Sequence, residues 1–522
     1  SGAYAAGLLP VGSYEVTARS LGYRAARRSG VQVRLGATVP LDFALPRQAV
    51  QLEELVATAE EPLINVAKVE NSTLLDEEVV KGLPNNGRNY LNLTLLTPNV
   101  AITQGPDGDE LTIAGQRGIH NNVSVDGADF NSPFFGEQRG GQRPAFTFNL
   151  DAIEDMVVVA SGANAEFGRS GGGFVNVLTK SGTNELHGSV HYFGKYDPLS
   201  ANFAHEGQVE EPDFRQHQFG ATFGGPLVRD KAFFFLAYDQ QEFNSTKQKD
   251  PNRIDPALRA WMDTAYSGVL AGDYGPIDRT NDAKALLAKL DFQLNDRNRA
   301  TLKYNFADAE QVLGTFDADP WGRSANGIEK VRSHAINGSL SSLLSSSVSN
   351  EFRFQWAREE RPRPYPGPIN PQTGRPFPDT GMDFVNGYRF GMPFFLPIET
   401  AYDTRIQVLD NVSFVTGNHL IKVGGEWNRT KTKQTFLGFG NGRAIFGSVG
   451  GFLGFVENGP NYVECFDDVS GNFVGTDNNA TCPAGSSIGG PVILYLQNAG
   501  VSPVTFEEAG TQTIEQNELA LF

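Results

Sequence analysis

Apolar and polar side chains alternate along the chain from residue 184 onward. Between Leu286 and Leu294 every second side chain is apolar, and Lys289, Asp291 and Gln293 occupy the positions between them. The same alternation recurs in Ala300–Phe306, Val348–Trp356 and Ile421–Asn428. A β-strand with one apolar and one polar face has this period of two. The pattern therefore predicts a large antiparallel sheet.

The connections between these strands are alternately short and long. Short turns fall near 224–230, 295–298, 345–347 and 416–419, and long segments near 245–283, 307–332, 361–402 and 435–516. A soluble sandwich can alternate too, but outer-membrane barrels combine such strands with short turns at one end and long loops at the other. Residues 184–522 are thus predicted to form the first part of a transmembrane antiparallel β-barrel. Asp410 falls on the apolar register of its strand, which predicts a bulge there.

The barrel prediction has two consequences. We count about nine or ten strands, against roughly 22 in plugged transporters, and therefore expect the chain to be a piece of a longer protein. The apolar face of Leu286, Leu290 and Phe292 should contact lipid, while Lys289 and Asp291 should line the lumen.

The first 183 residues have a different organisation, although the whole chain is predicted to be mostly β. Short alternating segments at 12–18, 30–35 and 39–45 predict part of a β-sandwich over residues 1–46. Residues 74–81 and 90–96 have helical patterns. Strands are predicted at 123–130, where Asp126-Gly127 indicates a hairpin, at 153–160 and at 173–179. Residues 61–183 are therefore predicted to be an α+β domain.

The linker at 47–60 contains a short β-prone run with no obvious strand partner nearby. Its residues are Leu52, Glu53, Glu54, Leu55, Val56, Ala57, Thr58 and Ala59. Such a run can add as a strand to the sheet edge of another protein. The alternative is a plain linker strand.

Composition narrows the class of protein. The net charge of −17 argues against nucleic-acid binding, which usually requires a basic face. The 58 glycines and 37 phenylalanines, against 4 methionines, suit strands, turns and aromatic belts. No apolar stretch reaches the length of a transmembrane helix, but a transmembrane strand needs only about 10 residues.

Neither the two cysteines nor the one match to a catalytic motif indicates an enzyme. The two cysteines, Cys465 and Cys482, lie in a Gly/Asn/Asp-rich stretch; a loop disulfide is the preferred interpretation, with two free thiols as the alternative. The Gly168-x-Ser170-x-Gly172 match to a nucleophile elbow is discounted, because a strand rather than a helix follows it. No metal site, cofactor or catalytic residue is predicted.

Several runs resemble known families. "LTIAGQRGIHNNVSVDGADFN" and "IEDMVVVASGANAEFGRSGGGFVNVLTKSGTNELHGSVHYFGK" resemble the plug domains of TonB-dependent receptors. The second run and "FGGPLVRDKAFFFLAYD" are similar to the Oar-like (OmpA-related) subfamily in particular. "LPVGSYEVTARSLGYRAARRSGVQVRLGATVPLDFAL" resembles the C-terminal part of a carboxypeptidase-regulatory-like domain, a transthyretin-like accessory module without peptidase activity.

This resemblance implies a function. It implies a receptor of the Gram-negative outer membrane, with a periplasmic N-terminal domain, that takes up a large or scarce solute with energy from the TonB complex. Leu52–Ala59 takes the place of the TonB box. Outer-membrane lipid is a further expected partner. The solute remains open between siderophore, oligosaccharide and peptide. The alternative is a surface-interaction or secretion-related protein that binds a macromolecule through its long loops.

Two sets of candidate site residues follow. Arg117 and Arg169 are expected either to pair with inward carboxylates of the barrel and hold the plug, or simply to face water in the lumen; the candidate carboxylates are Glu351 and Glu426. Aromatic and cationic residues at the plug apex are candidate ligand contacts: Phe130, Phe134, Phe135 and Arg139.

Overall fold

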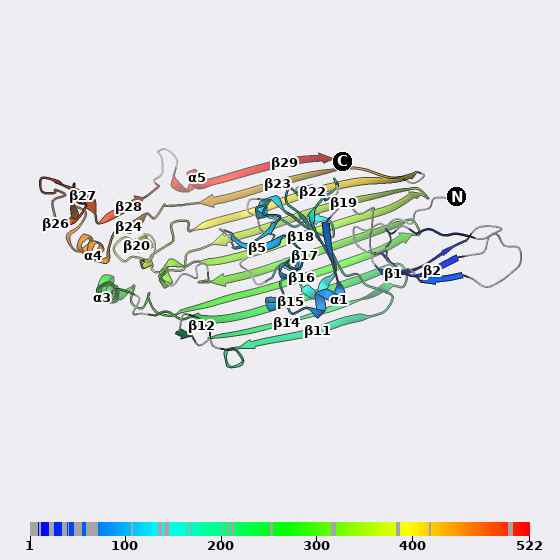
Figure 1. The fold of residues 1–522 in the computed structure, drawn as a ribbon, viewed down its shortest axis with the longest axis horizontal. Helices are drawn as coiled ribbons and strands as arrows, with labels where there is room; N and C mark the ends of the chain where they lie inside the picture. The colour runs from blue at the N-terminus through cyan, green and yellow to red at the C-terminus, as the bar shows by residue number, and fades with distance from the viewer. Residues whose placement is uncertain are drawn as a thin grey trace, which may run out of the picture.

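The computed structural model describes residues 9, 12–19, 26–33, 39, 41–45, 55–58, 71–105, 108–133, 138–139, 146–163, 165–168, 170–201, 203–205, 208–210, 213–250, 254–314, 320–382, 387–416, 419–498 and 505–522. These residues form a long ten-stranded sheet, an α+β domain that lies against it and corresponds to the predicted plug, a small N-terminal sheet at one end, and the connections between the long strands (Figure 1).

The long sheet has ten strands, and each strand pairs antiparallel with its neighbours. In spatial order they are β11 (His187–Tyr196), β14 (Phe214–Val228), β15 (Ala232–Lys247), β16 (Ile277–Asn295), β17 (Asn298–Val312), β18 (Ile328–Ser345), β19 (Val348–Arg363), β22 (Ile398–Thr416), β23 (His419–Phe436) and β29 (Thr511–Leu521). Spatial order follows chain order, as in an up-and-down barrel wall. The sheet is open, with β11 and β29 at its edges, and the predicted mostly-β antiparallel fold is confirmed.

Several strands are longer than their alternation of side chains suggests. β16 begins at Ile277 rather than near Leu286, and it stays paired with β15 from the Ile277–Lys247 pair onward. The backbones of two strands can pair whether or not their side chains form an apolar face. The alternation of apolar and polar side chains therefore marks only the part of a strand that has such a face.

The bulge predicted at Asp410 lies elsewhere. The pairing of β22 shifts register between Thr400 and Tyr402, whereas Asp410 pairs regularly with Phe352 and Gly425. Asp410 faces outward and accepts a 2.6 Å hydrogen bond from Asn350. A neighbouring outward amide therefore satisfies the carboxylate without a backbone irregularity.

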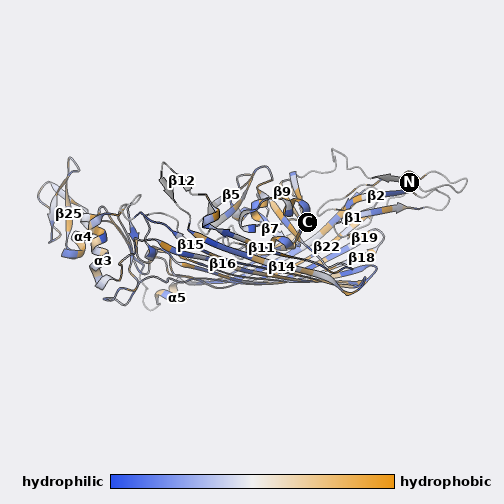
Figure 2. Cartoon of the chain, turned by 90° about the horizontal axis from the view of Figure 1, so that it is seen from below, coloured by the Kyte–Doolittle hydropathy of each residue, from blue (hydrophilic) through white to orange (hydrophobic). Residues whose placement is uncertain are grey.

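The two faces of the sheet differ in what covers them. Lys289 and Asp291 point inward and are buried, as the alternation predicts. Apolar side chains on the outward face remain accessible, with exposed fractions of 48% for Leu302, 38% for Phe352 and 38% for Trp427. The plug domain covers only the inward face (Figure 2). The outward face is an unpartnered apolar surface of the kind that lipid covers.

The plug domain is built on a mixed five-stranded sheet in the order β4-β9-β10-β7-β8. The strands are β4 (Asn71–Asp76), β9 (Ile153–Ser161), β10 (Phe174–Thr179), β7 (Asn122–Val125) and β8 (Ala128–Asp129); the helices α1 (Glu77–Gly82) and α2 (Leu91–Thr94) and the hairpin β5 (Val100–Gly105)–β6 (Gly108–Ile113) flank it. Its core contains Tyr90, Ile113, Met156 and Val175. The helix predicted from Leu74 begins only at Glu77, because Asp76 caps it by accepting a hydrogen bond from the Val79 amide and β4 precedes it.

The N-terminal sheet contains β1 (Gly12–Ala18), β2 (Ala26–Val33) and β3 (Leu55–Thr58). The strand predicted at 39–45 is not formed, because residues 41–45 have no strand pairing. β3 takes the third place instead and pairs parallel to β2, from the Ala26–Leu55 pair to the Ser29–Thr58 pair. The expectation that this run lacks a nearby partner is therefore wrong.

The long connections pack together at the end of the sheet opposite the N-terminal strands (Figure 1). We call this assembly, drawn from residues 254–276, 320–327, 364–382, 387–397 and 437–498, the cap. It contains α3 (Pro256–Thr264), α4 (Val449–Asn458), the sheet of β21 (Arg389–Phe390), β20 (Asp379–Met382), β24 (Arg443–Phe446) and β28 (Val492–Leu496), and the sheet of β26 (Phe473–Asp477), β25 (Val463–Asp467) and β27 (Ser486–Gly490). Leu258, Met262, Phe390 and Phe452 lie in its core. The cap is thus a folded unit rather than a set of separate loops.

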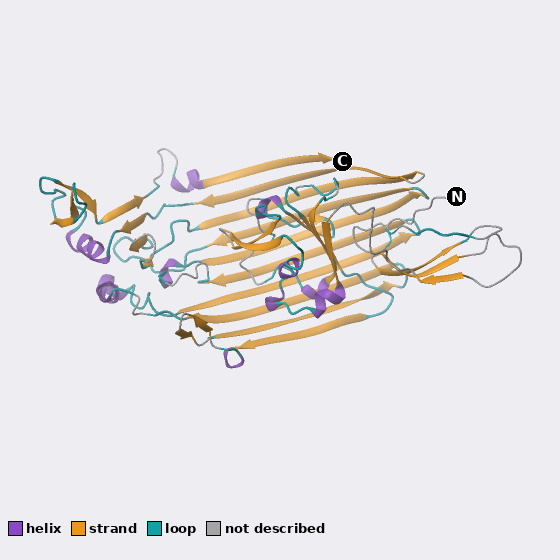
Figure 3. Ribbon diagram, in the orientation of Figure 1, coloured by secondary structure: helices purple, strands orange, loops and turns teal. Residues whose placement is uncertain are grey.

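Short elements complete the structure. The hairpin β12 (Phe203–His205)–β13 (Gln208–Glu210) lies between β11 and β14, and α5 (Phe506–Gly510) precedes β29. Among the residues that the structure describes, helices lie in the plug domain and in the connections of the long sheet (Figure 3). Over the described ranges, no helix has the length and apolar character needed to cross a membrane.

Candidate functional site at the plug–sheet interface

A tight hairpin presents the plug domain to the long sheet. β7 and β8 are joined by Asp126 and Gly127, which have φ angles of 52° and 73°. Two successive positive φ angles define the type I′ turn that Asp-Gly favours. The positive φ of Gly127 favours glycine at this position, and a Cβ atom there would also displace the guanidinium of Arg353 on β19.

The turn places Asp126 against two lysines of the sheet. Its carboxylate lies 2.6 Å from Lys303 Nζ and accepts hydrogen bonds from the amide (2.8 Å) and hydroxyl (2.7 Å) of Thr179. Lys289 Nζ donates to the Thr179 carbonyl at 2.9 Å. Burial favours the neutral acid, but the ammonium groups of Lys289 and Lys303 outweigh it and hold the pKa of Asp126 well below its usual range. This carboxylate is therefore ionised and anchored to β16 and β17.

The following strand delivers a second carboxylate. Asp129 forms an ion pair with Arg405 on β22, and both side chains are 3% exposed. The Asp129 amide donates to Gln407 Oε1 at 3.0 Å, and Asn428 Nδ2 lies 3.4 Å from Asp129 Oδ2. Arg405 also donates to the Asn131 carbonyl at 3.0 Å. One aspartate thus joins the plug to β22 and β23.

The residues predicted for the plug apex lie in a different environment. Phe130 is 6% exposed and packs edge-on against Phe148 in the plug core, with ring centroids 6.1 Å apart. Arg139 is 5% exposed and donates to the Asp129 carbonyl (3.1 Å) and to Gln355 of β19 (3.3 Å). Both are interior residues, so the prediction that they contact an external ligand is not supported. Phe134 and Phe135 lie outside the described residues.

The predicted plug–barrel ion pairs are also placed differently. Arg117 is exposed and has no ion pair with any described residue, while Glu351 accepts hydrogen bonds of 2.9 and 2.7 Å from Arg353 on its own strand. Glu426 accepts a 2.8 Å hydrogen bond from Gln407. Arg169 lies outside the described residues. Arg353, two positions along β19, thus supplies the cation that pairs with Glu351.

Other plug–sheet contacts surround these two aspartates. Glu166 forms an ion pair with Lys422 on β23. Near β11, Asp151 lies 2.7 Å from both Arg88 Nη2 and His191 Nδ1. A hollow of about 470 Å³ lies between the α1 region of the plug and the strands β11 and β14. The plug therefore does not fill the space beside these two strands. Two small buried apolar clusters also join the plug to the sheet, one formed by Ala152 with Phe235, Ala237 and Leu287 and the other by Phe146 with Ala283 and Ala285. The interface therefore combines polar and apolar contacts and is incompletely packed.

Sequence reasoning missed Asp126, Asp129, Lys303 and Arg405 as contact residues. A signal for them was present, since Lys303 occupies the polar face of an alternating strand, Asp126 is the first residue of the Asp-Gly turn and Asp129 follows two positions after that turn. What the sequence does not show is which inward position each aspartate meets, because that depends on how the plug sits against the sheet.

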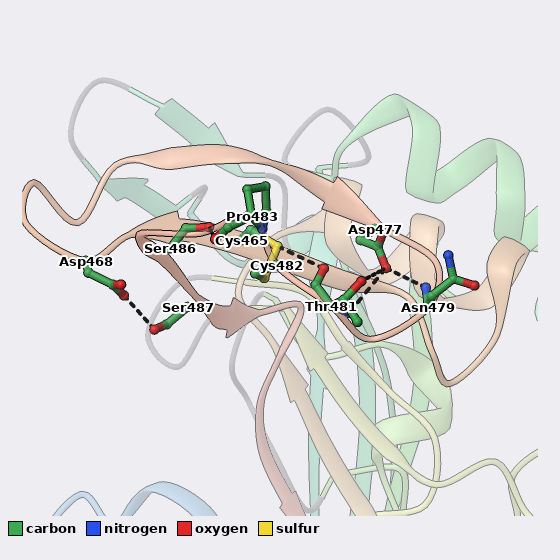
Figure 4. Close-up of a disulfide and its surroundings, with 9 residues drawn as sticks. All are labelled: Cys465, Asp468, Asp477, Asn479, Thr481, Cys482, Pro483, Ser486 and Ser487. Atoms are coloured by element: carbon green, nitrogen blue, oxygen red, sulfur yellow. Dashed lines mark hydrogen bonds between the residues drawn. A yellow bond between two sulfur atoms is a disulfide. The ribbon is translucent and has the colours of Figure 1, made fainter.

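Two further sets of predicted residues have a defined place. Of the coupling segment, residues 55–58 form β3, and Leu52, Glu53, Glu54 and Ala59 lie outside the described residues. Cys465 and Cys482 form a disulfide, with their Cα atoms 5.6 Å apart. Figure 4 shows it between β25 and the turn in which Asp477 accepts hydrogen bonds from Asn479 and Thr481. The disulfide thus belongs to the cap.

Comparison with known proteins identifies similar chains. The family described as "Outer membrane beta barrel domain" matches residues 178–260 and 246–458. The chain is 28% identical over 347 residues to the TonB-dependent transporter Oar of Myxococcus xanthus, covering 62% of this chain and 31% of that protein. It is 29% identical over 217 residues to the probable TonB-dependent siderophore receptor PirA of Acinetobacter baumannii, covering 39% of this chain and 26% of that protein.

A solved structure has a similar fold. The outer-membrane transporter YddB of Escherichia coli matches with a TM-score of 0.51 and 12% identity, over 78% of this chain and 51% of that one. The chain spans 31% and 26% of the length of the two curated relatives.

Proposed function

This chain belongs to the outer-membrane β-barrel family and is homologous to TonB-dependent receptors, and from that premise we propose that it takes part in importing a large or scarce solute across the outer membrane, energised by TonB. The relatives are named as transporters and receptors, not as enzymes. The solute class stays open between siderophore, oligosaccharide and peptide, and one of the two relatives is named as a probable siderophore receptor.

The observation that carries the proposal is the polar attachment of the plug. Asp126 and Asp129 reach Lys303 and Arg405 through single side chains, and the hollow near β11 leaves part of the interface unfilled. Polar contacts can be replaced by water when the plug moves, whereas separating a dry apolar interface of the same area would expose apolar surface. A mechanical pull on the plug can therefore open a path without unfolding the barrel.

The β3 strand is the proposed handle for that pull. β3 forms one edge of the β1-β2-β3 sheet, so within the described residues one side of its backbone carries no neighbouring strand. An exposed strand edge accepts another strand by backbone hydrogen bonding. TonB is the proposed partner, and the N-terminal sheet lies at the end of the long sheet opposite the cap (Figure 1).

A proline scan of β3 in the intact receptor tests this proposal. In a strand, successive N–H groups point to opposite sides, and proline removes one of them. Replacing Leu55, Val56, Ala57 and Thr58 one at a time should therefore abolish uptake at alternate positions, namely those whose N–H faces the open edge. We expect V56P to be among the inactive variants. Binding of the transported solute to intact cells should be unchanged in every variant.

The scan can either support or contradict a coupling role for β3. Loss of uptake at alternate positions, with surface binding retained, supports strand addition at β3. Full uptake in all four variants removes the coupling role from this segment. The matched control is V56T, which keeps the N–H and a β-branched side chain and should transport normally.

The packed cap favours one alternative function. Its helices, two sheets and disulfide form a folded surface, which would suit binding of a macromolecule outside the cell. In that case surface binding would depend on the cap, and no cellular activity would depend on β3. The proline scan therefore separates the two functions.

A further inference from the structure

A shallow hollow lies on the outward face of the long sheet, close to the end that carries the cap. Its volume is about 280 Å³ and it is lined by Arg358, Tyr402, Thr404, Ile406, Arg429 and Lys431. These residues come from β19, β22 and β23, which are hydrogen-bonded neighbours in the interior of the sheet (Figure 1). The hollow is therefore a feature of the sheet surface and not of its open edges.

The hollow lies at the border of the apolar band. Ile406 pairs with Trp356 on one side and with Arg429 on the other. One row further from the cap, Val408 pairs with Phe354 and Trp427, so the surface there is apolar. Rows on one face are about 7 Å apart along a strand. Tryptophans at such a border are typical of the level of lipid headgroups.

The cations of the hollow are only partly neutralised. Arg358 lies 2.9 Å from Glu360 and stacks over Tyr402, with its guanidinium carbon 5.5 Å from the ring centre. Arg429 lies 2.8 Å from Glu515. Lys431 is exposed and makes no ion pair with any residue that the structure describes. Three cations thus meet two carboxylates, all at the surface.

Neighbouring cations on the outward face, near the same end of the sheet, each have a carboxylate partner. Lys330 lies 2.8 Å from Glu310, and Arg332 lies 3.0 Å from Asp308. Neither residue lines the hollow. An excess of positive charge therefore coincides with the concave surface, and the adjoining part of the face provides a matched pair for comparison.

We propose that this hollow binds the phosphate group of a lipid headgroup in the outer leaflet of the outer membrane. A guanidinium presents several N–H groups in a planar fork that fits phosphate, and Arg358 and Arg429 have donors beyond those that meet Glu360 and Glu515. Lys431 adds a point charge. Ile406 and the tryptophan-containing rows below it would contact the upper part of the acyl chains.

Lipid binding to the intact receptor, purified in an uncharged detergent, tests the site. The probe is diphosphoryl lipid A, titrated and counted by native mass spectrometry. Two further measurements identify the group that binds. One uses the same lipid after removal of both phosphates, and the other adds inorganic phosphate as a competitor. The test variant is R358Q/K431Q and the matched control is K330Q/R332Q, since each removes one outward arginine and one outward lysine. Heat-modified migration on gels checks that both variants fold.

We expect R358Q/K431Q to raise the apparent Kd for lipid A about tenfold or more, because each basic residue near an anionic headgroup contributes a factor of several. The control variant should change the apparent Kd less than about twofold. Lipid A without its phosphates should bind at least about tenfold more weakly. Millimolar inorganic phosphate should not displace the lipid. Equal weakening by both variants would mean non-specific attraction and would overturn the site. So would unchanged binding in R358Q/K431Q, or full displacement by inorganic phosphate, which would assign the hollow to a soluble anion.

Discussion

At the scale of single residues, the plug is held by buried charges whose partners lie far away in the chain. Asp129 and Arg405 are 276 positions apart and are both nearly inaccessible. Removing two such charges from water costs several kcal/mol, which their attraction and extra hydrogen bonds must offset. Arg405 makes such an extra bond to Asn131, and Asp129 makes one to Asn428. The pair therefore determines where the plug sits more than how strongly it is held.

This reasoning predicts an asymmetric mutational result at Arg405. R405A leaves the Asp129 carboxylate buried without its cation and should weaken protection of the β7–β8 hairpin by about 3–5 kcal/mol. R405A/D129N removes both charges and should restore most of that loss. Peptide-resolved hydrogen exchange of residues 122–129 in the intact receptor measures both effects.

The control for this experiment is R332A, whose ion pair with Asp308 is on the outward surface. It should change the protection by less than about 1 kcal/mol. If R405A and the double variant lost the same protection, the buried charge would not be the cause of the loss.

At the scale of elements, alternation of side chains allowed the faces of the strands to be assigned but not their lengths or the pairing of short runs. The inward position of Lys289 and the Asp126-Gly127 hairpin follow directly from local pattern. The third N-terminal strand does not, because residues 39–45 and 55–58 have similar β propensity and only packing selects between them. The bulge in β22 likewise lies at the cap end, where the alternation carries no information.

The assignment of faces predicts a depth-dependent cost of charge on β16. Leu290 and Leu294 both lie on β16, and Leu290 faces outward and pairs with Phe234 and Leu302 in the apolar band. Leu294 lies next to the turn and is 59% exposed. L290R should destabilise the intact receptor in vesicles by about 2–4 kcal/mol, and L294R by about 0–1 kcal/mol. Urea unfolding followed by tryptophan fluorescence gives both values.

The two leucines form their own matched control, because the residue type and the strand are identical. A cost for L290R no larger than that for L294R would mean that this face does not contact the hydrocarbon region. Equal and large costs would instead indicate protein packing against the whole length of β16.

At the scale of the whole molecule, the structure has two different ends. The cap joins connections that are separated by nearly 200 residues of chain, and Asp273 links them by accepting hydrogen bonds from Tyr388 (2.8 Å) and the Ser324 amide (2.6 Å). No sequence period indicates such packing, since the contacts are between irregular segments, so the sequence predicts long loops but not their joint fold. The cysteine pair was the one local signal of a stabilised loop.

The two ends predict which side of the membrane each connection faces, and epitope insertion tests this most directly. One tag follows Val469, a 97% exposed turn residue in the cap, and the other lies between Asp296 and Arg297 in the short turn that joins β16 and β17. The N-terminal sheet with β3 lies at the end opposite the cap, and TonB acts from the periplasm, so the cap should face the outside (Figure 1). Long connections on the external side are also usual for outer-membrane barrels.

Antibody on intact cells should therefore bind only the tag after Val469, and both tags should react once the outer membrane is permeabilised. Labelling of the Asp296–Arg297 tag alone on intact cells would invert the orientation, and with it the proposed access of TonB to β3. Reaction of both tags on intact cells would mean that the sheet does not span the membrane at all.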